Sequence, residues 1–181
     1  MSNRTLIIYS SVYGQAEKIA RRIADACASW GVAAIAGDVR TIDANDLVQA
    51  DVILVVASVH YGRHPRALVR FLTKHRVRLA SRRSGLISVS GDAADRARMA
   101  RAEEYVQKLL ATTHWIPSEW HLAAGAMSFS KYNWFVRWVM KRSLAERGVT
   151  VDVTRDHEQT DWEDVLRFAK AFVTTTESRV A

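Results

Sequence analysis

Short apolar runs alternate with stretches of helical periodicity along this chain, and the alternation restricts the possible folds more than any other feature. The most informative run is 51–57, in which every residue after Asp51 is apolar. Such a strand is typical of a sheet that helices cover on both faces, because neither of its sides then meets water. Repeated strand–helix alternation also implies parallel strands, since these need crossover connections. The sequence therefore predicts an α/β protein with a doubly wound parallel sheet and this run in its middle.

The periodicities also locate the individual elements. The expected strands are 5–9, 32–36, 51–57, 85–89 and 122–126, and the expected helices are 15–30, 65–74, 95–111 and one that begins near Thr160. Thr160 and Glu163 have the spacing of a capping box. Residues 128–148 separate 122–127 from 149–153, which indicates an insertion that splits the last strand of a five-stranded sheet.

Length and cysteine content set further limits. A chain of 181 residues, 49% of them hydrophobic, is expected to form a single domain over residues 1–181. Its one cysteine, Cys27, excludes an internal disulfide and a multi-cysteine zinc site, and no metal is expected. No run resembles a secretory signal or reaches the roughly 18 apolar residues of a membrane-spanning helix, so we expect a cytoplasmic protein.

The positive charge of the chain is distributed unevenly. The formal net charge is +7, and residues 52–91 contain eight arginines and lysines but no acidic residue. Such a field favours an anionic partner: nucleic acid, anionic lipid, or a small molecule with carboxylates or phosphates. A solvated helix face explains any single one of these cations equally well. The basic stretch lacks interleaved aromatic residues and no nucleic-acid motif is present, so no nucleic acid is expected among the partners.

A hydroxyl-rich segment follows the first expected strand and leads into the first expected helix. It consists of Ser10, Ser11, Val12, Tyr13, Gly14, Gln15 and Ala16. Backbone N–H groups at a helix start, together with serine hydroxyls, can bind a phosphate, and Gly14 lets the chain curl around it. No nucleoside-triphosphate loop or Gly-x-Gly-x-x-Gly motif is present, so a monophosphate is the better fit. Flavin mononucleotide (FMN) is the common cofactor of doubly wound sheets with strand order 2-1-3-4-5. The serines could equally cap the helix.

Two further loops should reach the same edge of the sheet, because ligands of such folds bind at the carboxyl ends of the strands. The loop after the third strand contains Ser58, Val59, His60, Tyr61 and Gly62, and the loop after the fourth contains Ser90, Gly91 and Asp92. His60 and Tyr61 have planar side chains that could stack on a flavin ring, and the Ser90 loop could donate N–H groups to its edge. The alternatives are an ordinary amphipathic tyrosine, a surface histidine, and an aspartate that only caps the next helix.

Several longer segments carry a resemblance to a known family. They are ASVHYGRHPRALVRFLTKH, HWIP, AAGAMSFSKYNWFVRWVMK and TDWEDV, and the likeness extends from about residue 5 to 173. The chain resembles the bacterial quinone-dependent protoporphyrinogen oxidases of the long-chain flavodoxin-like family. The resemblance implies FMN, oxidation of protoporphyrinogen IX to protoporphyrin IX in haem biosynthesis, and transfer of electrons to a membrane quinone, menaquinone or ubiquinone. One departure is Ala16, where the family commonly has threonine, and this puts the affinity for FMN in question.

The insertion and the arginines suggest where the partners bind. On a helix, Trp134 and Trp138 would share one side with Arg137 and Lys141. Tryptophans among cations suit the headgroup region of a bilayer. We therefore expect this segment to contact quinone and an anionic membrane, at the inner face of the cell membrane. The tryptophans could instead pack on the core or on a second copy in a homo-oligomer. The propionates of the substrate are expected to bind basic residues beside the loops, namely Arg63, His64, Arg66, Arg96 and Arg98.

The catalytic chemistry is less defined by the sequence. No side chain stands out as a general base, and His60 is the single weak candidate for accepting a proton. The alternatives to a porphyrinogen oxidase are a flavodoxin-type electron carrier and an NAD(P)H:quinone reductase. The basic charge and the tryptophan pair argue against a soluble carrier, which has no need of a surface that binds lipid.

Overall fold

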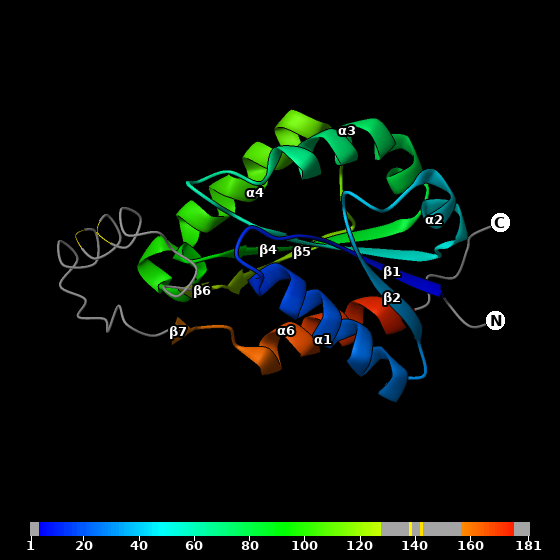
Figure 1. Ribbon diagram of the computed structural model, residues 1–181, viewed down its shortest axis with the longest axis horizontal. Helices are drawn as coiled ribbons and strands as arrows, with labels where there is room; N and C mark the ends of the chain where they lie inside the picture. The colour runs from blue at the N-terminus through cyan, green and yellow to red at the C-terminus, as the bar shows by residue number, and fades with distance from the viewer. Residues whose placement is uncertain (1–3, 128–137, 139–141, 143–156, 176–181) are drawn as a thin grey trace.

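A five-stranded parallel sheet runs through the middle of the computed structural model, which describes residues 4–127, 138, 142 and 157–175 (Figure 1). The strands lie in the order β2-β1-β3-β4-β5, which confirms the expected flavodoxin-like order. Their bounds are β1 Arg4–Ser10, β2 Ala33–Asp38, β3 Val52–Ser58, β4 Arg83–Ser90 and β5 Glu119–Ala124. From β1 the chain first adds β2 on one side and then returns to add β3 on the other side of β1. This reversal of strand order is the switch point at which ligands bind in open α/β sheets.

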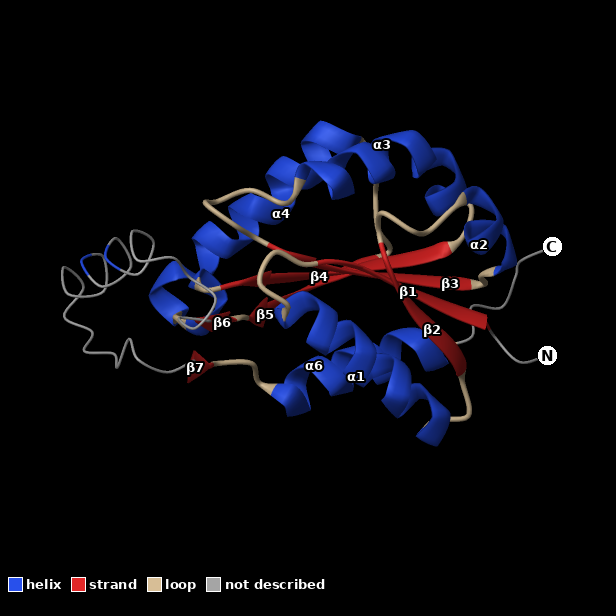
Figure 2. Ribbon diagram, viewed as in Figure 1, coloured by secondary structure: helices blue, strands red, loops and turns tan. Residues whose placement is uncertain are grey.

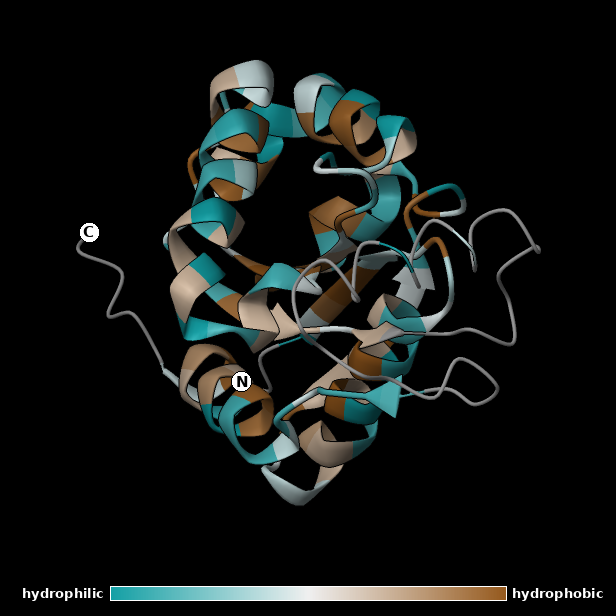
Figure 3. Ribbon diagram, turned by 90° about the vertical axis from the view of Figure 1, so that its left-hand side faces the viewer, coloured by the Kyte–Doolittle hydropathy of each residue, from teal (hydrophilic) through white to brown (hydrophobic). Residues whose placement is uncertain are grey.

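Helices cover both faces of the sheet (Figures 1 and 2). Helices α1 (Gln15–Ser29) and α6 (Trp162–Thr174) pack on one face. Helices α2 (Ala44–Gln49), α3 (Arg66–Ala80) and α4 (Met99–Thr113) pack on the other. Figure 3 shows that each helix carries both hydrophobic and hydrophilic residues, as expected for helices with one buried side.

Strand β3 contributes to two separate cores, because successive side chains of a strand point to opposite faces. Val52, Leu54 and Val56 belong to the cluster under α1 and α6. The alternate residues 53, 55 and 57 belong to the cluster under α2, α3 and α4. Residues 52–57 are all buried, which is the physical reason for the uninterrupted apolar run that follows Asp51.

Several element bounds differ from the expectation. Helix α3 continues to Ala80, because Leu79 adds another turn of buried contact on the core side. Helix α4 begins only at Met99, after two short 3₁₀ turns at Asp92–Ala94 and Arg96–Arg98. Helix α2 was not anticipated, since six residues are too few to show a helical period.

The final helix begins differently from the predicted capping box, and that prediction was wrong. The side chain of Asp161 accepts a hydrogen bond from Asp164 N at 3.0 Å and caps α6. The Thr160 hydroxyl instead donates to Ala124 O at 2.7 Å, which ties the start of α6 to the end of β5. The neighbouring aspartate therefore takes the capping role, while the threonine makes a tertiary contact.

A small second sheet extends from the end of β5. It consists of β6 (Ala126–Met127) and β7 (His157–Glu158), which pair antiparallel. The expected insertion at 128–148 lies outside the described residues except for Trp138 and Arg142, and so does the expected second half of the split strand at 149–153. In the part of the chain that the structure describes, no helix is long and apolar enough to cross a bilayer.

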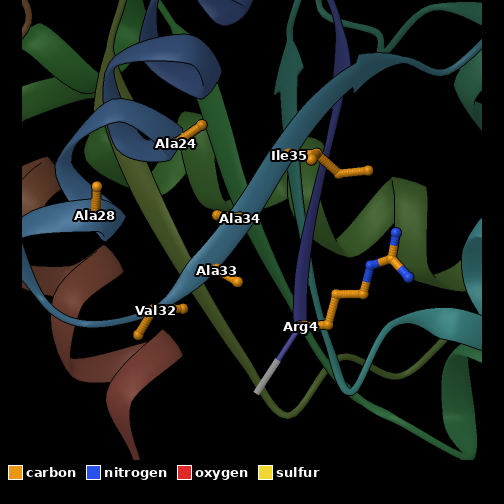
Figure 4. Close-up of a pocket in the computed structure, with 7 residues that line it drawn as sticks. All are labelled: Arg4, Ala24, Ala28, Val32, Ala33, Ala34 and Ile35. Atoms are coloured by element: carbon orange, nitrogen blue, oxygen red, sulfur yellow. The ribbon is translucent and has the colours of Figure 1, made fainter. Parts of the chain in front are cut away.

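A hollow of about 320 Å³ lies between α1 and the edge strand β2 (Figure 4). The residues that line it are Arg4, Ala24, Ala28, Val32, Ala33, Ala34 and Ile35. They surround the amino ends of β1 and β2, at the edge of the sheet opposite the expected ligand loops. Its lining is almost entirely aliphatic, and the guanidinium of Arg4 is engaged with Gln49 at 2.6 Å. The hollow therefore contains no group suited to the expected chemistry.

A close approach in the core provides a test of the fold. A Cβ added to Gly85 on β4 would lie 2.7 Å from Cζ of Phe172 on α6, which is fully buried. We expect Gly85→Ala to lower the free energy of unfolding by about 1–3 kcal/mol through overpacking, as measured by urea denaturation. Gly91→Ala is the matched control, because a Cβ there meets no atom within 4 Å. Equal stability of the two variants would contradict the packing of α6 on β4.

Candidate functional site

The three expected loops meet at one edge of the sheet because the parallel register aligns the ends of the strands. Ser10 lies beside Ala57, Ser58 beside Val89, and Ser90 beside Ala124. The segments 10–16, 58–62 and 90–92 leave the sheet from these positions. The structure thus brings together all the residues that the sequence indicated for cofactor binding.

Serine hydroxyls shape the first loop rather than cap the helix that follows it. The Ser58 hydroxyl accepts a hydrogen bond from Val12 N at 3.2 Å and donates to Ser10 O at 3.2 Å, so it joins the first loop to the second. The Ser11 hydroxyl accepts from Gly14 N at 2.9 Å and closes a turn within the loop. The alternative that Ser10 or Ser11 caps the helix does not agree with these contacts.

The start of α1 keeps its backbone donors available. Gly14 occupies the N-cap position with a φ of 100°, a left-handed conformation that favours glycine, and no described side chain caps the helix there. The first-turn N–H groups, which have no partner within a helix, therefore face the loop region. Together with the positive end of the helix dipole they form a site for an anion. Ala16 is fully buried, so its missing hydroxyl removes a donor without opening the site.

Gln15 connects this loop to the small second sheet. Its amide donates to Glu158 Oε1 at 2.7 Å and to Thr160 Oγ1 at 2.8 Å. Lys18, one turn later on α1, forms an ion pair with Glu158 at 2.9 Å. The sequence analysis missed these contacts, because they join residues at least 140 positions apart and follow no local spacing.

The second loop is a tight turn with an exposed aromatic tip. His60 and Arg63 exchange backbone hydrogen bonds of 2.8 and 3.1 Å, and the central residues Tyr61 and Gly62 have φ values of 48° and 73°. The Tyr61 side chain is 75% exposed. Its ring centroid lies 4.0 Å from that of His60, which in turn lies 5.1 Å from that of Tyr13 on the first loop. Three aromatic rings are therefore gathered where the two loops meet.

Two of these rings, His60 and Tyr13, are uncharged at neutral pH. Burial lowers the pKa of His60 below its ordinary value, so the imidazole is neutral at pH 7. Burial, with a smaller effect of Tyr61, raises the pKa of Tyr13, so its phenol remains protonated. A neutral aromatic surface beside an anion-binding helix start is suited to a ligand with a planar ring and a phosphate tail.

The third loop is held by a network around the Asp92 carboxylate. Tyr105 on α4 donates its hydroxyl to Asp92 Oδ2 at 2.6 Å, and Arg98 forms an ion pair with Asp92 Oδ1 at 2.6 Å. The Tyr105 ring also lies against Gly62, where an added Cβ would be 3.4 Å from its Cε1 atom. Tyr105 therefore touches both the second and the third loop.

This network excludes one alternative for the third loop and includes a residue that the sequence analysis did not single out. Asp92 does not cap a helix, because its carboxylate is occupied by Tyr105 and Arg98, and the nearby cap is Asp95, which accepts from Ala97 N. The role of Tyr105 was missed. In the sequence it is one of several apolar and aromatic residues on the inner side of a helix, and only its need for a hydroxyl partner could have indicated a further contact.

The residues expected to bind propionates fall into three groups. Arg63, Arg66 and Arg96 are exposed beside the loops. Arg98 is near them, but its guanidinium is paired with Asp92. His64 is only 8% exposed and its Nε2 atom lies 3.1 Å from Ser88 Oγ, so it faces the core and cannot receive a carboxylate from solvent. Its inclusion among the propionate-binding residues was therefore wrong.

Of the four insertion residues singled out from the sequence, the structure describes one. Trp138 is 53% exposed, and the guanidinium of Arg142 lies 5.9 Å from the centroid of its ring. Trp134, Arg137 and Lys141 lie outside the described residues.

Comparisons with known proteins agree with this geometry. A family model described as a flavodoxin domain matches residues 6–161. The protoporphyrinogen IX dehydrogenase (quinone) of Escherichia coli strain K12 is 30% identical over 175 residues, which cover 96% of this chain and 97% of that protein. The protein of the same name from Leishmania major is 30% identical over 178 residues, covering 94% of this chain and 75% of its own.

Solved structures show the same fold at lower sequence identity. A short-chain flavodoxin associated with a non-canonical PDU bacterial microcompartment superimposes with a TM-score of 0.60 at 13% identity, covering 97% of this chain and 99% of that one. A flavodoxin mutant from Pseudomonas aeruginosa gives 0.56 at 19% identity, covering 95% and 99%. The strand order and the placement of the three loops are thus those of a flavodoxin fold.

The buried His64 provides a test that depends on pH. Burial lowers the pKa of His64 to about 4, whereas an unfolded histidine has a pKa near 6.5. The unfolded chain therefore binds the proton more readily, and stability should be lost as the pH falls from about 6.5 towards 4. This contribution is on the order of 3 kcal/mol, measured as the difference in unfolding free energy between neutral and acidic urea titrations.

We expect His64→Asn to flatten this dependence on pH. His114→Asn is the control, because His114 is exposed and its left-handed backbone tolerates asparagine. If the two variants lose the same stability on acidification, His64 is not the buried neutral group described above.

Proposed function

We propose an activity on the premise that this chain belongs to the flavodoxin family, in the group that contains the protoporphyrinogen IX dehydrogenases (quinone). The chain is an FMN-dependent oxidoreductase that converts protoporphyrinogen IX to protoporphyrin IX in haem biosynthesis and passes the electrons to a membrane quinone. The observation that carries this proposal is the 30% identity to the Escherichia coli enzyme across 96% of this chain and 97% of that protein.

The three loops are the proposed FMN site. The N–H groups at the start of α1 and the surrounding loop 10–16 bind the phosphate, and Gly14 supplies the left-handed turn that they need. The loops 58–62 and 90–92 bind the ring between them, with Tyr61 as the exposed aromatic surface. Bound FMN supplies the two-electron oxidation, for which no side chain of the protein is suited. Tyr105 fixes the loops 58–62 and 90–92 relative to each other through its contacts with Gly62 and Asp92.

The substrate is an electron-rich tetrapyrrole with two propionates. Arg63, Arg66 and Arg96 receive these carboxylates, since all three are exposed beside the ring loops and a guanidinium can bind a carboxylate through two parallel hydrogen bonds. Arg98 contributes charge while it holds Asp92 in place. His60 is the proposed proton acceptor, because its lowered pKa leaves a neutral ring nitrogen available at pH 7.

The quinone and the membrane are assigned to the insertion. Trp138 presents an exposed aromatic ring, and the sequence places Trp134, Arg137 and Lys141 within four residues of it. Tryptophans among cations suit the headgroup region of a bilayer, where the indole rings are buried and the cations contact lipid phosphates. We therefore place the protein in the cytoplasm, bound peripherally to the inner face of the cell membrane.

The activity can be tested directly on the full chain. Reconstituted with FMN, the protein should be yellow and should form fluorescent porphyrin from protoporphyrinogen IX under anaerobic conditions, and only when a quinone is supplied. Porphyrin fluorescence and flavin absorbance are recorded together. Bleaching by NADPH alone, followed by reoxidation with quinone, would indicate an NAD(P)H:quinone reductase instead. A flavin that exchanges single electrons with a soluble carrier but yields no porphyrin would indicate a flavodoxin-type carrier, and failure to retain FMN would contradict all three.

The propionate site predicts a specific kinetic effect. Arg66→Gln should raise the KM for protoporphyrinogen about ten-fold with little change in kcat, because a charge-assisted hydrogen bond to substrate is lost in the ground state and the transition state alike. Arg76→Gln removes the same charge from an exposed position nearer the far end of α3 and should leave KM within about two-fold. Similar KM values for both variants would show that Arg66 does not bind the substrate.

A further inference from the structure

The outer side of α3 carries only positive charge. The helix contains five arginines and lysines and no acidic residue. Four of them, Arg66, Arg70, Lys74 and Arg78, are spaced four residues apart and are all exposed. Residues at this spacing are neighbours on a helix surface, so these four form a continuous row, here called the cation row, about 18 Å long.

The other long helices are built differently. On α1, Arg21 pairs with Glu17 at 2.9 Å, and on α4, Lys108 pairs with Glu104 at 3.7 Å. On α6, Arg167 pairs with acidic residues of the first turn. Each of these helices alternates charge of both signs on its exposed side. Among the ion pairs that join described residues, none includes a member of the cation row.

This arrangement disfavours the helix itself. Like charges four residues apart repel one another and destabilise a helix. Arg66 also lies in the first turn, where the helix dipole favours acidic residues, and α3 has none there. The Arg78 guanidinium donates to Ala44 O at 3.2 Å, but no member of the row pairs with an acidic side chain among the described residues. A row of like charges that weakens its own helix is explained most directly by an external anion that binds along it.

We propose that the cation row is a docking surface for an anionic lipid bilayer. The row lies on an outer layer of the fold and winds by about 120° around the helix axis from Arg66 to Arg78. The headgroups of an anionic bilayer are mobile and present matching charge along such a row. Val77 lies three residues after Lys74 and is 76% exposed, which suits the boundary between headgroups and acyl chains. The cation row itself is argued from the charges of α3 alone. The choice of a membrane as its partner rests on the proposed function, because the proposed electron acceptor is a quinone that dissolves in lipid.

A nucleic acid is the less favoured partner for the same row. Single strands are bound by aromatic side chains on which bases stack. The one aromatic residue of α3 apart from His75, Phe71, is buried in the core, so the exposed side offers cations and Val77 but no stacking surface.

The test compares two double variants of the full chain. Arg70→Gln with Lys74→Gln removes two charges from the middle of the row, away from the proposed FMN and propionate residues. Lys108→Gln with Lys170→Gln removes the same charge from α4 and α6, where both lysines are exposed. Binding is measured by co-sedimentation with vesicles of phosphatidylcholine alone and of an equimolar mixture with phosphatidylglycerol.

We expect the parent to bind the mixed vesicles and to be released by high salt, since added ions screen surface charge. The cation-row variant should bind roughly 25-fold more weakly, because each cation near an anionic surface contributes about a factor of five. The control pair should bind within about three-fold of the parent, because charges outside the contact act only through the screened field. The melting temperature of the cation-row variant should be unchanged or slightly raised, since glutamine removes the repulsion without a loss of helix propensity.

Three results would overturn the proposal: equal loss of binding in both double variants, undiminished binding of the cation-row variant, and displacement of the vesicles by single-stranded DNA that binds the row more tightly. The rate with a water-soluble quinone and no vesicles is measured in parallel, and it should be the same for the parent and both variants. Absence of that activity in all three proteins would count against the proposed function and not against the docking surface.

Discussion

Burial of β3 on both faces is the constraint from which the rest of the structure follows. Its residues 52–57 pack alternately into two cores, one under α1 and α6 and the other under α2, α3 and α4. A strand in that position has no side chain free to contact a ligand. Polar and aromatic groups can therefore act only where the strands end, and the shared parallel register brings those ends to one edge. The three-loop site lies at the carboxyl ends of the strands because the interior of the sheet is closed to solvent.

Long-range polar contacts then give the loops their shape. Ser58 joins the first loop to the second, Tyr105 joins the second to the third, and Gln15 joins the first to the small sheet at β7. Each contact links residues from different elements and uses one side-chain group. The loops themselves contribute backbone donors, a left-handed glycine and neutral rings. Such a site suits the proposed role, in which the protein positions a cofactor and the cofactor supplies the redox chemistry.

Charged side chains lie around the three-loop site and on the helices, and not among its aromatic rings. In the ring cluster beside the site, His60 and Tyr13 are neutral at pH 7, since burial lowers the pKa of the histidine and raises that of Tyr13. Among the described residues, Arg63 and Arg96 at the rim of the site and the cations along α3 have no acidic partner, while the other long helices contain ion pairs of their own. A neutral interior and a basic exterior fit a protein whose cofactor ring is enclosed and whose other partners are anionic or membrane-bound.

The sequence by itself determined the fold class and the three loops, because these follow from local periodicity and from the rule that places ligands at the carboxyl ends of parallel strands. The strand order was expected from the flavodoxin-like resemblance, since local periodicity does not specify which strands are neighbours. It also indicated the family, through segments such as His60–Arg66 that lie beside the site. Only the tertiary structure decided which groups inside those segments are available. His64 lies between the exposed Arg63 and Arg66, yet it turns into the core, and Thr160 has the spacing of a capping residue, yet it bonds to β5. The physical reason is that burial and hydrogen-bond partners arise from residues far apart in the chain, as with Tyr105 and Gly62, and no local pattern records them.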